Sequence, residues 1–358
     1  MLFYESGSFP NAIIKEYSDM SLHHSNLCVP VTVENSPGYN SWPMLQADSR
    51  RLVCLYSRGK GHTIVTGDRN LYARISRDGG KSWEAEITVS ALPEYSEIPI
   101  GKGVDSQGRI LFWVRRGTPQ PPHFEHVLYR LDEDETFRVI AQPHLQPVPM
   151  QITDLFFVPT VGLTALWFAT DYQNHGDDSW GMLISRDDGV SWEQRTIEGG
   201  LPLSELPTEP AAVYVGDGKI LAVARTENRS GGAMQRQWQL ESSDCGKSWT
   251  RRRTNIGDVC LSTPTLIFDP STGTVSNYYY QRGEGRLLCR TTGVEAVWQQ
   301  PEAWPEPEVV AMGSTEFADA GNTNATVSGA QHLIAYYTGV APQTNIVIIA
   351  RHAPPPRK

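Results

Sequence analysis

The sequence predicts an all-β protein, a six-bladed β-propeller, because two repeating patterns run along its 358 residues. The first is an eight-residue motif, Ser-x-Asp-x-Gly-x-x-Trp, whose copies span residues 76–83, 185–192 and 242–249. The second is a longer period of about 55 residues, a length that accommodates one four-stranded blade with its loops. It occurs six times, which predicts six blades.

The short motif predicts a self-contained hairpin turn. Its aspartate is expected to bond the backbone two residues on, and its glycine tolerates a positive φ. The tryptophan at its end is expected to pack beneath the turn.

The long period is seen in two sets of apolar segments, all short and rich in β-branched and aromatic residues. This composition suits strands that are buried on both faces between neighbouring blades. The opening segments are residues 41–45, 97–100, 152–157, 208–213, 262–267 and 322–327, and the return strands are residues 51–56, 109–114, 163–168, 219–224, 275–280 and 332–337. The predicted blades cover residues 39–93, 94–148, 149–204, 205–258, 259–317 and 318–352.

The last predicted blade has only three strands of its own, because the chain runs into three prolines after residues 346–349. We expect the fourth strand to come from residues 9–35, where segments 11–16 and 28–33 are the candidates. Such closure ties the two ends of the ring together. It predicts a single domain over residues 1–358.

Composition bounds the class of protein. A hydrophobic content of 39% and ten tryptophans can form a large core. No apolar run approaches the roughly 18 residues that span a bilayer, so no membrane insertion is expected. The charged residues within the first twenty positions argue against a secretory signal. Five cysteines without a Cys-x-x-Cys pair predict free thiols, as in a cytoplasmic protein or a phage virion protein released by lysis.

The net charge of −9 excludes nonspecific nucleic-acid binding as a function. The spacing of histidine and cysteine shows no metal-ligand cluster. We therefore expect no metal and no organic cofactor.

Arginines recur where the second strand of a blade ends. The residues at this position are Arg58, Arg115 or Arg116, Arg225 and Arg282, with Thr170 and Thr338 in the third and sixth blades. Equivalent strand ends of a propeller converge on one mouth of the channel. The arginines are therefore expected to form an anion site, since guanidinium grips a carboxylate bidentately. The alternative is that each arginine pairs with a nearby carboxylate.

Two acidic residues occupy equivalent heights on the first strands of adjacent blades, Asp154 and Glu209. Paired carboxylates that face a cleft are the groups that glycosidic cleavage needs. For Asp154 the alternative is a cap at a turn or strand end.

The three short motifs are similar to the Asp-box, or BNR repeat, of the sialidase-like β-propellers. The Glu209-Pro210 dipeptide, followed by the strand end Ala224-Arg225-Thr226, resembles the Glu-Pro and arginine stretch of sialidases. This resemblance implies that Glu209 is an active-site glutamate and that Arg225 belongs to a carboxylate-binding triad. It makes Arg282 the best further triad residue, with Arg286 as the fallback.

The departures from the family point to one branch. Where exosialidases have Arg-Ile-Pro, this chain has Ser41-Trp42-Pro43, and neither the aspartate acid nor the tyrosine nucleophile can be assigned. The tyrosines at 278–280, 336 and 337 are expected to pack within strands. The pattern resembles the phage endosialidases, which keep a glutamate, two arginines and a histidine, here His62. Their barrel, stalk and chaperone have no room here, so a homotrimer is expected only if the assembly is phage-like.

The resemblance implies hydrolysis of an α-ketosidic bond in a glycan that contains sialic acid or polysialic acid. Arg225 and Arg282 would hold the carboxylate, with Arg58 as an auxiliary, and Glu209 with His62 would act on water. Trp42 and Trp180 are candidates for stacking on sugar faces. Two alternatives remain open: a noncatalytic propeller that binds anionic glycans, and an enzyme that cleaves another acidic sugar such as a uronate.

Overall fold

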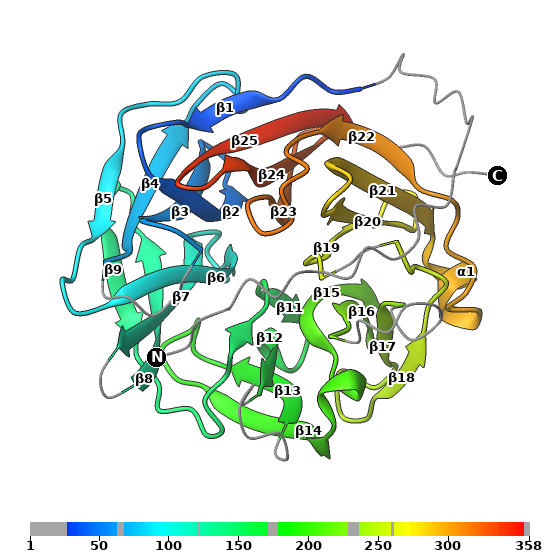
Figure 1. The fold of residues 1–358 in the computed structure, drawn as a ribbon. Coiled ribbons are helices and arrows are strands. Elements are labelled where there is room, and N and C mark those ends of the chain that lie inside the picture. The colour runs from blue at the N-terminus through cyan, green and yellow to red at the C-terminus, as the bar shows by residue number, and fades with distance from the viewer. Residues whose placement is uncertain are drawn as a thin grey trace.

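The chain is an all-β propeller in which the sheets stand around a common axis (Figure 1). The computed structural model describes residues 27–62, 68–119, 122–170, 178–227, 236–258 and 261–353. Helix is confined there to α1 (Val294–Gln299) and a 3₁₀ turn at Leu203–Glu205. This confirms the predicted fold class at the level of an all-β propeller.

One sheet contains strands from both ends of the chain. Its order is β23-β24-β25-β2-β3-β4-β5, with β1 paired to β25. The strands are β1 (Val31–Glu34), β2 (Tyr39–Ala47), β3 (Leu52–Gly59), β4 (Asn70–Ser76), β5 (Ile87–Ser90), β23 (Gly321–Ser328), β24 (Gln331–Val340) and β25 (Gln343–His352). A parallel bridge from Tyr39 to Thr344 joins its N-terminal and C-terminal parts.

The remaining sheets follow one another along the chain. The first comprises β6 (Ser96–Val104), β7 (Ile110–Pro119), β8 (Pro122–Leu131) and β9 (Phe137–Ala141), and the second β10 (Gln151–Ile152), β11 (Phe156–Val158), β12 (Gly162–Ala169), β13 (Asp178–Ser185) and β14 (Glu193–Leu201). The third comprises β15 (Thr208–Gly216), β16 (Lys219–Arg225), β17 (Trp238–Ser242) and β18 (Thr250–Arg253), and the fourth β19 (Thr265–Asp269), β20 (Thr274–Gln281), β21 (Arg286–Gly293) and β22 (Glu308–Met312). Their first strands lie nearest the axis (Figure 1).

The two ends of the chain meet in the shared sheet. Strand β1 pairs antiparallel with β25, with Val31 opposite Ile348 and Thr32 opposite Val347. It overlaps the predicted segment 28–33, whereas the other candidate, 11–16, lies outside the described residues. The outermost strand beside β25 is therefore supplied by the N-terminal part of the chain.

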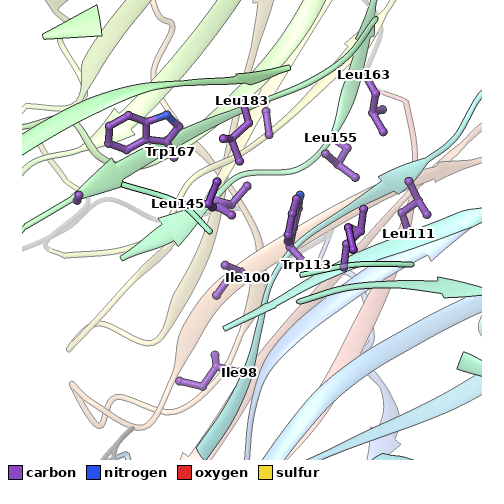
Figure 2. Packing of buried hydrophobic residues seen from close by; sticks show 14 residues of the cluster. Ile98, Ile100, Leu111, Trp113, Leu145, Leu155, Leu163, Trp167 and Leu183 are labelled. Atoms are coloured by element: carbon purple, nitrogen blue, oxygen red, sulfur yellow. The ribbon is translucent and has the colours of Figure 1, made fainter. Parts of the chain in front are cut away.

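Apolar side chains fill the space between neighbouring sheets. Figure 2 shows one such cluster, between the sheet that begins with β6 and the sheet that begins with β10, where Trp113 and Trp167 are fully buried. The alternating large residues of second strands such as β7 and β12 are covered on both faces. This is the burial that the return-strand composition predicted.

The three Ser-x-Asp-x-Gly-x-x-Trp copies form the same turn. In each, the first serine hydroxyl bonds the aspartate and accepts the glycine N–H, and the glycine has a φ of 88°, 90° or 82°. The expected aspartate contact was wrong in its spacing. The carboxylate in each copy accepts the backbone N–H of the serine four residues on, because the turn wraps around the carboxylate; these aspartates are Asp78, Asp187 and Asp244.

The tryptophans of the motif extend the core. Trp192 packs 5.1 Å from Trp113, and Trp249 packs 5.6 Å from Trp180, between ring centroids. Both donate their ring N–H to the carbonyl of the motif glycine. Trp180 is 1% exposed, so it belongs to this packing and not to a sugar-binding surface as we had expected.

No helix in the described part of the chain is long and apolar enough to cross a membrane. Among the same residues Cys28, Cys54, Cys245 and Cys289 are free thiols, and the fifth cysteine lies outside them. Cys54 and Cys289 are buried.

Candidate functional site

The candidate site begins where β15 enters its sheet. Glu209 has a φ of 45° at a bulge between Thr208 and Ala211. A positive φ is uncommon for a residue other than glycine, and such strain is found at functional sites. Trp42 and Asn322 share it, with φ values of 52° and 45°, at the matching bulges of β2 and β23. The first strands of three parts of the ring thus carry the same local distortion.

A chain of hydrogen bonds links Glu209 to the arginine that follows β20. Arg225, the last residue of β16, donates from Nη1 to Oε2 of Glu209 at 3.0 Å. Thr263 donates its hydroxyl to the same oxygen and lies 3.4 Å from Oδ1 of Asn322. Asn322 in turn accepts a bond of 3.0 Å from Nη2 of Arg282. The structure therefore brings together Glu209, Arg225 and Arg282.

Arg225 and Arg282 differ in how their charge is balanced. Arg225 is 9% exposed and bonds Glu227 as well as Glu209. Arg282 makes no ion pair within the described ranges, and its buried Nε has no hydrogen-bond partner there. Gly321, with a φ of 113°, lets the guanidinium approach, since a Cβ there would lie 3.1 Å from Nε. Arg282 is therefore the cation best placed to receive an anion.

His62 and Trp42 lie beside these groups. The ring centroid of His62 is 5.2 Å from that of Trp42, and Trp42 is 6.3 Å from Tyr337. As a residue His62 is exposed, yet desolvation of its ring, which packs against Trp42 and Tyr39, lowers its pKa to about 4, with help from the positive charges of Arg282, Arg69 and Arg225. The imidazole is thus neutral over the physiological range.

Arg69, which the sequence analysis did not select, packs against the ring of Trp42. Its guanidinium carbon lies 4.6 Å from the ring centroid of Trp42, and its Nη1 donates to the hydroxyls of Ser41 and Ser57 at 3.0 and 3.2 Å. Arg69 is 1% exposed, and burial lowers its pKa to about 10. Trp42 therefore rests on a buried cation.

Asp154 has a different set of contacts. Its carboxylate forms an ion pair of 3.2 Å with Lys102 and accepts bonds of 3.2 and 3.3 Å from the amide of Asn324. Lys102 also bonds the carbonyl of Ala325 at 2.7 Å. These contacts tie first strands together across the axis, and in the described residues none of them involves Glu209. The structure thus places Asp154 in a separate set of contacts from Glu209, and its catalytic role stays a prediction.

Arg58 and Arg286 also lie in other surroundings. Arg58 pairs with Glu34 and Glu86, and its Nε donates to Asn40 at 2.7 Å. Arg286 is surface exposed and pairs with Glu284 at 3.3 Å. The expected ring of arginines is therefore divided, because carboxylates of their own sheets neutralise several members: Arg116 pairs with Glu97 at 2.7 Å.

Residues that the sequence analysis missed include Thr263 and Asn322. Thr263 is the second residue of its opening segment, as Glu209 is, and Asn322, the first residue of its segment, matches Glu209 through the bulge and the positive φ. Aligning the openings residue by residue would have found them. No comparable signal marks Arg69 or Asp319, which come from connecting segments. Among the described residues no group of three or more His, Cys, Asp or Glu side chains is placed to hold a metal ion.

Comparison with known proteins supports the architecture. No protein-family model and no curated protein sequence matches the chain. Among solved structures, a protein of unknown function from Dyadobacter fermentans is similar with a TM-score of 0.72 and 18% identity, over 92% of this chain and 99% of that one.

Two glycosidases are similar in fold at lower identity. A Trypanosoma rangeli sialidase in complex with sialic acid has a TM-score of 0.61 and 13% identity, over 92% of this chain and 58% of the sialidase. An α-L-arabinofuranosidase from Fusarium graminearum with an iminosugar inhibitor has a TM-score of 0.61 and 11% identity, over 91% and 97%. The chain therefore has the propeller fold of these glycoside hydrolases.

Proposed function

We propose that the chain is a glycosidase that cleaves glycans containing sialic acid, in the manner of the endosialidases and without a tyrosine nucleophile. One observation carries this proposal: Arg282 has no carboxylate partner in the described residues, yet it bonds Asn322, whose Oδ1 lies 3.4 Å from the Thr263 hydroxyl that donates to Glu209. A half-buried guanidinium without a counter-ion favours a planar anion, and the carboxylate of an acidic sugar fits that geometry.

The two carboxylate oxygens of Glu209 have different roles, one held by protein groups and one directed at water. Arg225 and Thr263 occupy Oε2, whereas Oε1 accepts no hydrogen bond in the part of the chain that is described. Oε1 would orient or deprotonate the water that attacks the anomeric carbon, with His62 beside it. As the bond from that carbon to the glycosidic oxygen breaks, Glu209 holds the proton of the attacking water and the leaving oxygen takes up a proton from solvent.

The buried state of the tyrosines supports a route without a covalent tyrosine. Tyr336 and Tyr337 are 0% exposed and donate to the carbonyls of Met312 and Ala318 at 3.0 Å each. Burial raises the pKa of the Tyr337 hydroxyl. A phenol held in this way is a poor nucleophile.

A second candidate function is a noncatalytic propeller that binds anionic glycans. It is favoured by the state of the carboxylates around Glu209, because Glu227 is bound to Arg225 and Asp154 to Lys102. Neither is free to act as the second carboxylate that glycosidases use. Cleavage of a uronate would need the same Arg282 and differs only in the sugar.

We further infer that the ring counts six blades over residues 39–352 within a single domain of residues 1–358, with the N-terminal segment closing the ring. The eight-stranded sheet would then supply two of them. A single bridge joins the two halves of this sheet. An apolar cluster lies between the halves, as between the other sheets, and it includes Cys54, Tyr56, Tyr337 and Ile348.

The proposal is tested by incubating the protein with polysialic acid, sialyllactose and a uronate capsule polymer, and by mapping the products. We expect turnover of a sialic acid substrate. Glu209→Gln should lower kcat by about 10²–10⁴-fold while ligand affinity is kept, since a general base contributes that much. Glu295→Gln is the matched control, because Glu295 lies on the exposed surface of α1.

The outcomes separate the candidates. Binding of any of the three glycans without turnover would favour the noncatalytic function. Turnover of the uronate polymer alone would change the substrate and keep the site. Equal turnover by Glu209→Gln and the control would refute the assignment of Glu209.

A further inference from the structure

A part-buried hydrogen-bond network that centres on Tyr39 lies beside His62. Nδ1 of the imidazole lies 3.1 Å from the hydroxyl of Tyr39, the first residue of β2. The same hydroxyl lies 3.0 Å from Oδ1 of Asp319 and 3.1 Å from the carbonyl of Ala318. Tyr39 itself is 0% exposed, so its hydroxyl is held at a fixed place between these three partners.

The chemistry of these groups decides where the protons are. A hydroxyl has one proton to donate, and the Asp319 carboxylate and the Ala318 carbonyl can only accept. If Tyr39 donated to His62, the Asp319 oxygen would face the phenol oxygen with no proton between them. The same would hold if the proton pointed to Ala318, so the Tyr39 hydroxyl donates to Asp319, and Nδ1 of His62 must be the donor to Tyr39.

Two further observations agree with this arrangement. Burial, together with the negative charge of Asp319, raises the pKa of Tyr39 well above its ordinary value, so the phenol keeps its proton. The second oxygen of Asp319 accepts the backbone N–H of Ala341 at 2.8 Å, which holds the carboxylate in place. In a neutral imidazole whose Nδ1 carries the hydrogen, Nε2 has the free lone pair.

We propose that Asp319 and Tyr39 form a positioning relay that fixes the Nδ1–H tautomer of His62 and leaves Nε2 as a hydrogen-bond acceptor or base in the candidate site. Nε2 makes no hydrogen bond within the described ranges. The catalytic use of this lone pair, to accept a proton from water or a sugar hydroxyl, rests on the proposed function. The tautomer itself does not.

The charged groups around His62 keep it in the useful state. Arg282, Arg69 and Arg225 oppose protonation of the ring, and the negative charge of Asp319 favours it. The pKa of about 4 means that the base form persists down to acidic pH. Asp319 and Tyr39 fix the orientation and tautomer of the ring, and the arginines keep the imidazole unprotonated.

The tautomer is tested by long-range ¹H–¹⁵N NMR of the histidine rings in the uniformly labelled full chain, with His62→Gln used to assign the signals. The wild-type protein should show Nδ1–H with an unprotonated Nε2. In Asp319→Asn the amide can donate to the Tyr39 oxygen, so the phenol proton can turn to Nδ1 and the signal should move toward the Nε2–H form. A wild-type Nε2–H tautomer, or no change in Asp319→Asn, would overturn the relay.

Tyr39→Phe should also release the tautomer, and Tyr336→Phe is its control. Tyr336 is an equally buried tyrosine that bonds a backbone carbonyl, so its loss reproduces the cost of a missing buried hydroxyl without touching His62. If both variants changed the His62 signals alike, the effect would be structural and the relay would be refuted.

Kinetics distinguish the relay from the proposed function. If a sialic acid polymer is cleaved, Tyr39→Phe and Asp319→Asn should lower kcat by about 10-fold with KM unchanged. The acid limb of wild-type kcat/KM should then fall near pH 4, well below the ordinary histidine value of about 6.5. If no glycan is cleaved, the proposed function fails while the NMR result still decides the relay.

Discussion

Arg58 and Arg282 occupy the same position in two parts of the ring, at the end of a second strand, but their surroundings are opposite. Arg58 contacts two carboxylates, Glu34 at 3.3 Å and Glu86, and stacks 4.5 Å from the ring centroid of Tyr72. Arg282 has only the amide oxygen of Asn322 and an unsatisfied Nε within the described residues.

The difference shows how one repeat position can serve two purposes. Where the sheet itself supplies carboxylates, the arginine stabilises the fold. Where it does not, the guanidinium keeps a charge that a ligand can neutralise. Charge balance, and not position along the strand, separates a structural arginine from a binding one.

The largest expected effect is on the free energy of unfolding, when the structural arginine, Arg58, is removed. Arg58→Ala should lower the free energy of unfolding by about 3 kcal/mol, because it leaves Glu34, whose side chain is 0% exposed, with Arg74 as its remaining cation. Chemical denaturation monitored by tryptophan fluorescence measures this loss. A change below about 0.5 kcal/mol would show that the pair is not structural.

The converse is expected of Arg282. Arg282→Gln should leave the free energy of unfolding nearly unchanged and weaken binding of a sialic acid ligand by about 10- to 100-fold, since charge-assisted hydrogen bonds contribute about 1.5–3 kcal/mol. Calorimetric titration measures the affinity. Arg286→Gln, four residues later and paired with Glu284 on the surface, is the control, and an equal loss in both variants would contradict the assignment.

The smallest expected effect is the acid sensitivity of the Arg58 region. Although burial opposes it, hydrogen bonds from Ser36, Tyr56 and Arg74 lower the pKa of Glu34 to about 2. The unfolded carboxyl has a pKa of about 4.3, so the unfolded chain takes up the proton first as the pH falls. This contribution to stability is complete above about pH 4.3 and is lost toward pH 2.

Thermal melts between pH 2 and pH 7 test this sign. The wild-type protein should lose stability more steeply than Glu34→Gln over the acidic part of this range, although the variant starts from a lower value. Parallel curves for the two proteins would mean that Glu34 is not the responsible group.

The repeat pattern of the sequence was enough for the fold class and for much of the site. The aromatic run at 278–280 predicted β20, because successive large residues suit a strand that is covered on both faces. Glu209, Arg225 and Arg282 were found because they stand at fixed positions of a repeat whose strand ends converge.

What the sequence could not show was the partner of each charge. Glu34 lies in β1 and Arg58 in β3, and only the closed sheet brings them together. Asp154 meets Lys102 and Asn324 from distant strands for the same reason. Asp319 and Arg69 reach the site from connecting segments, whose paths no periodicity describes.

The most direct test of the central claim, that the unpaired charge of Arg282 binds a ligand carboxylate, uses the Glu209→Gln protein so that the ligand is not consumed. Its affinity is measured for sialyllactose and for the methyl ester of the same carboxyl group. We predict binding of the acid and at least about 10-fold weaker binding of the ester, a difference that Arg282→Gln abolishes. Equal affinity for acid and ester would contradict the account.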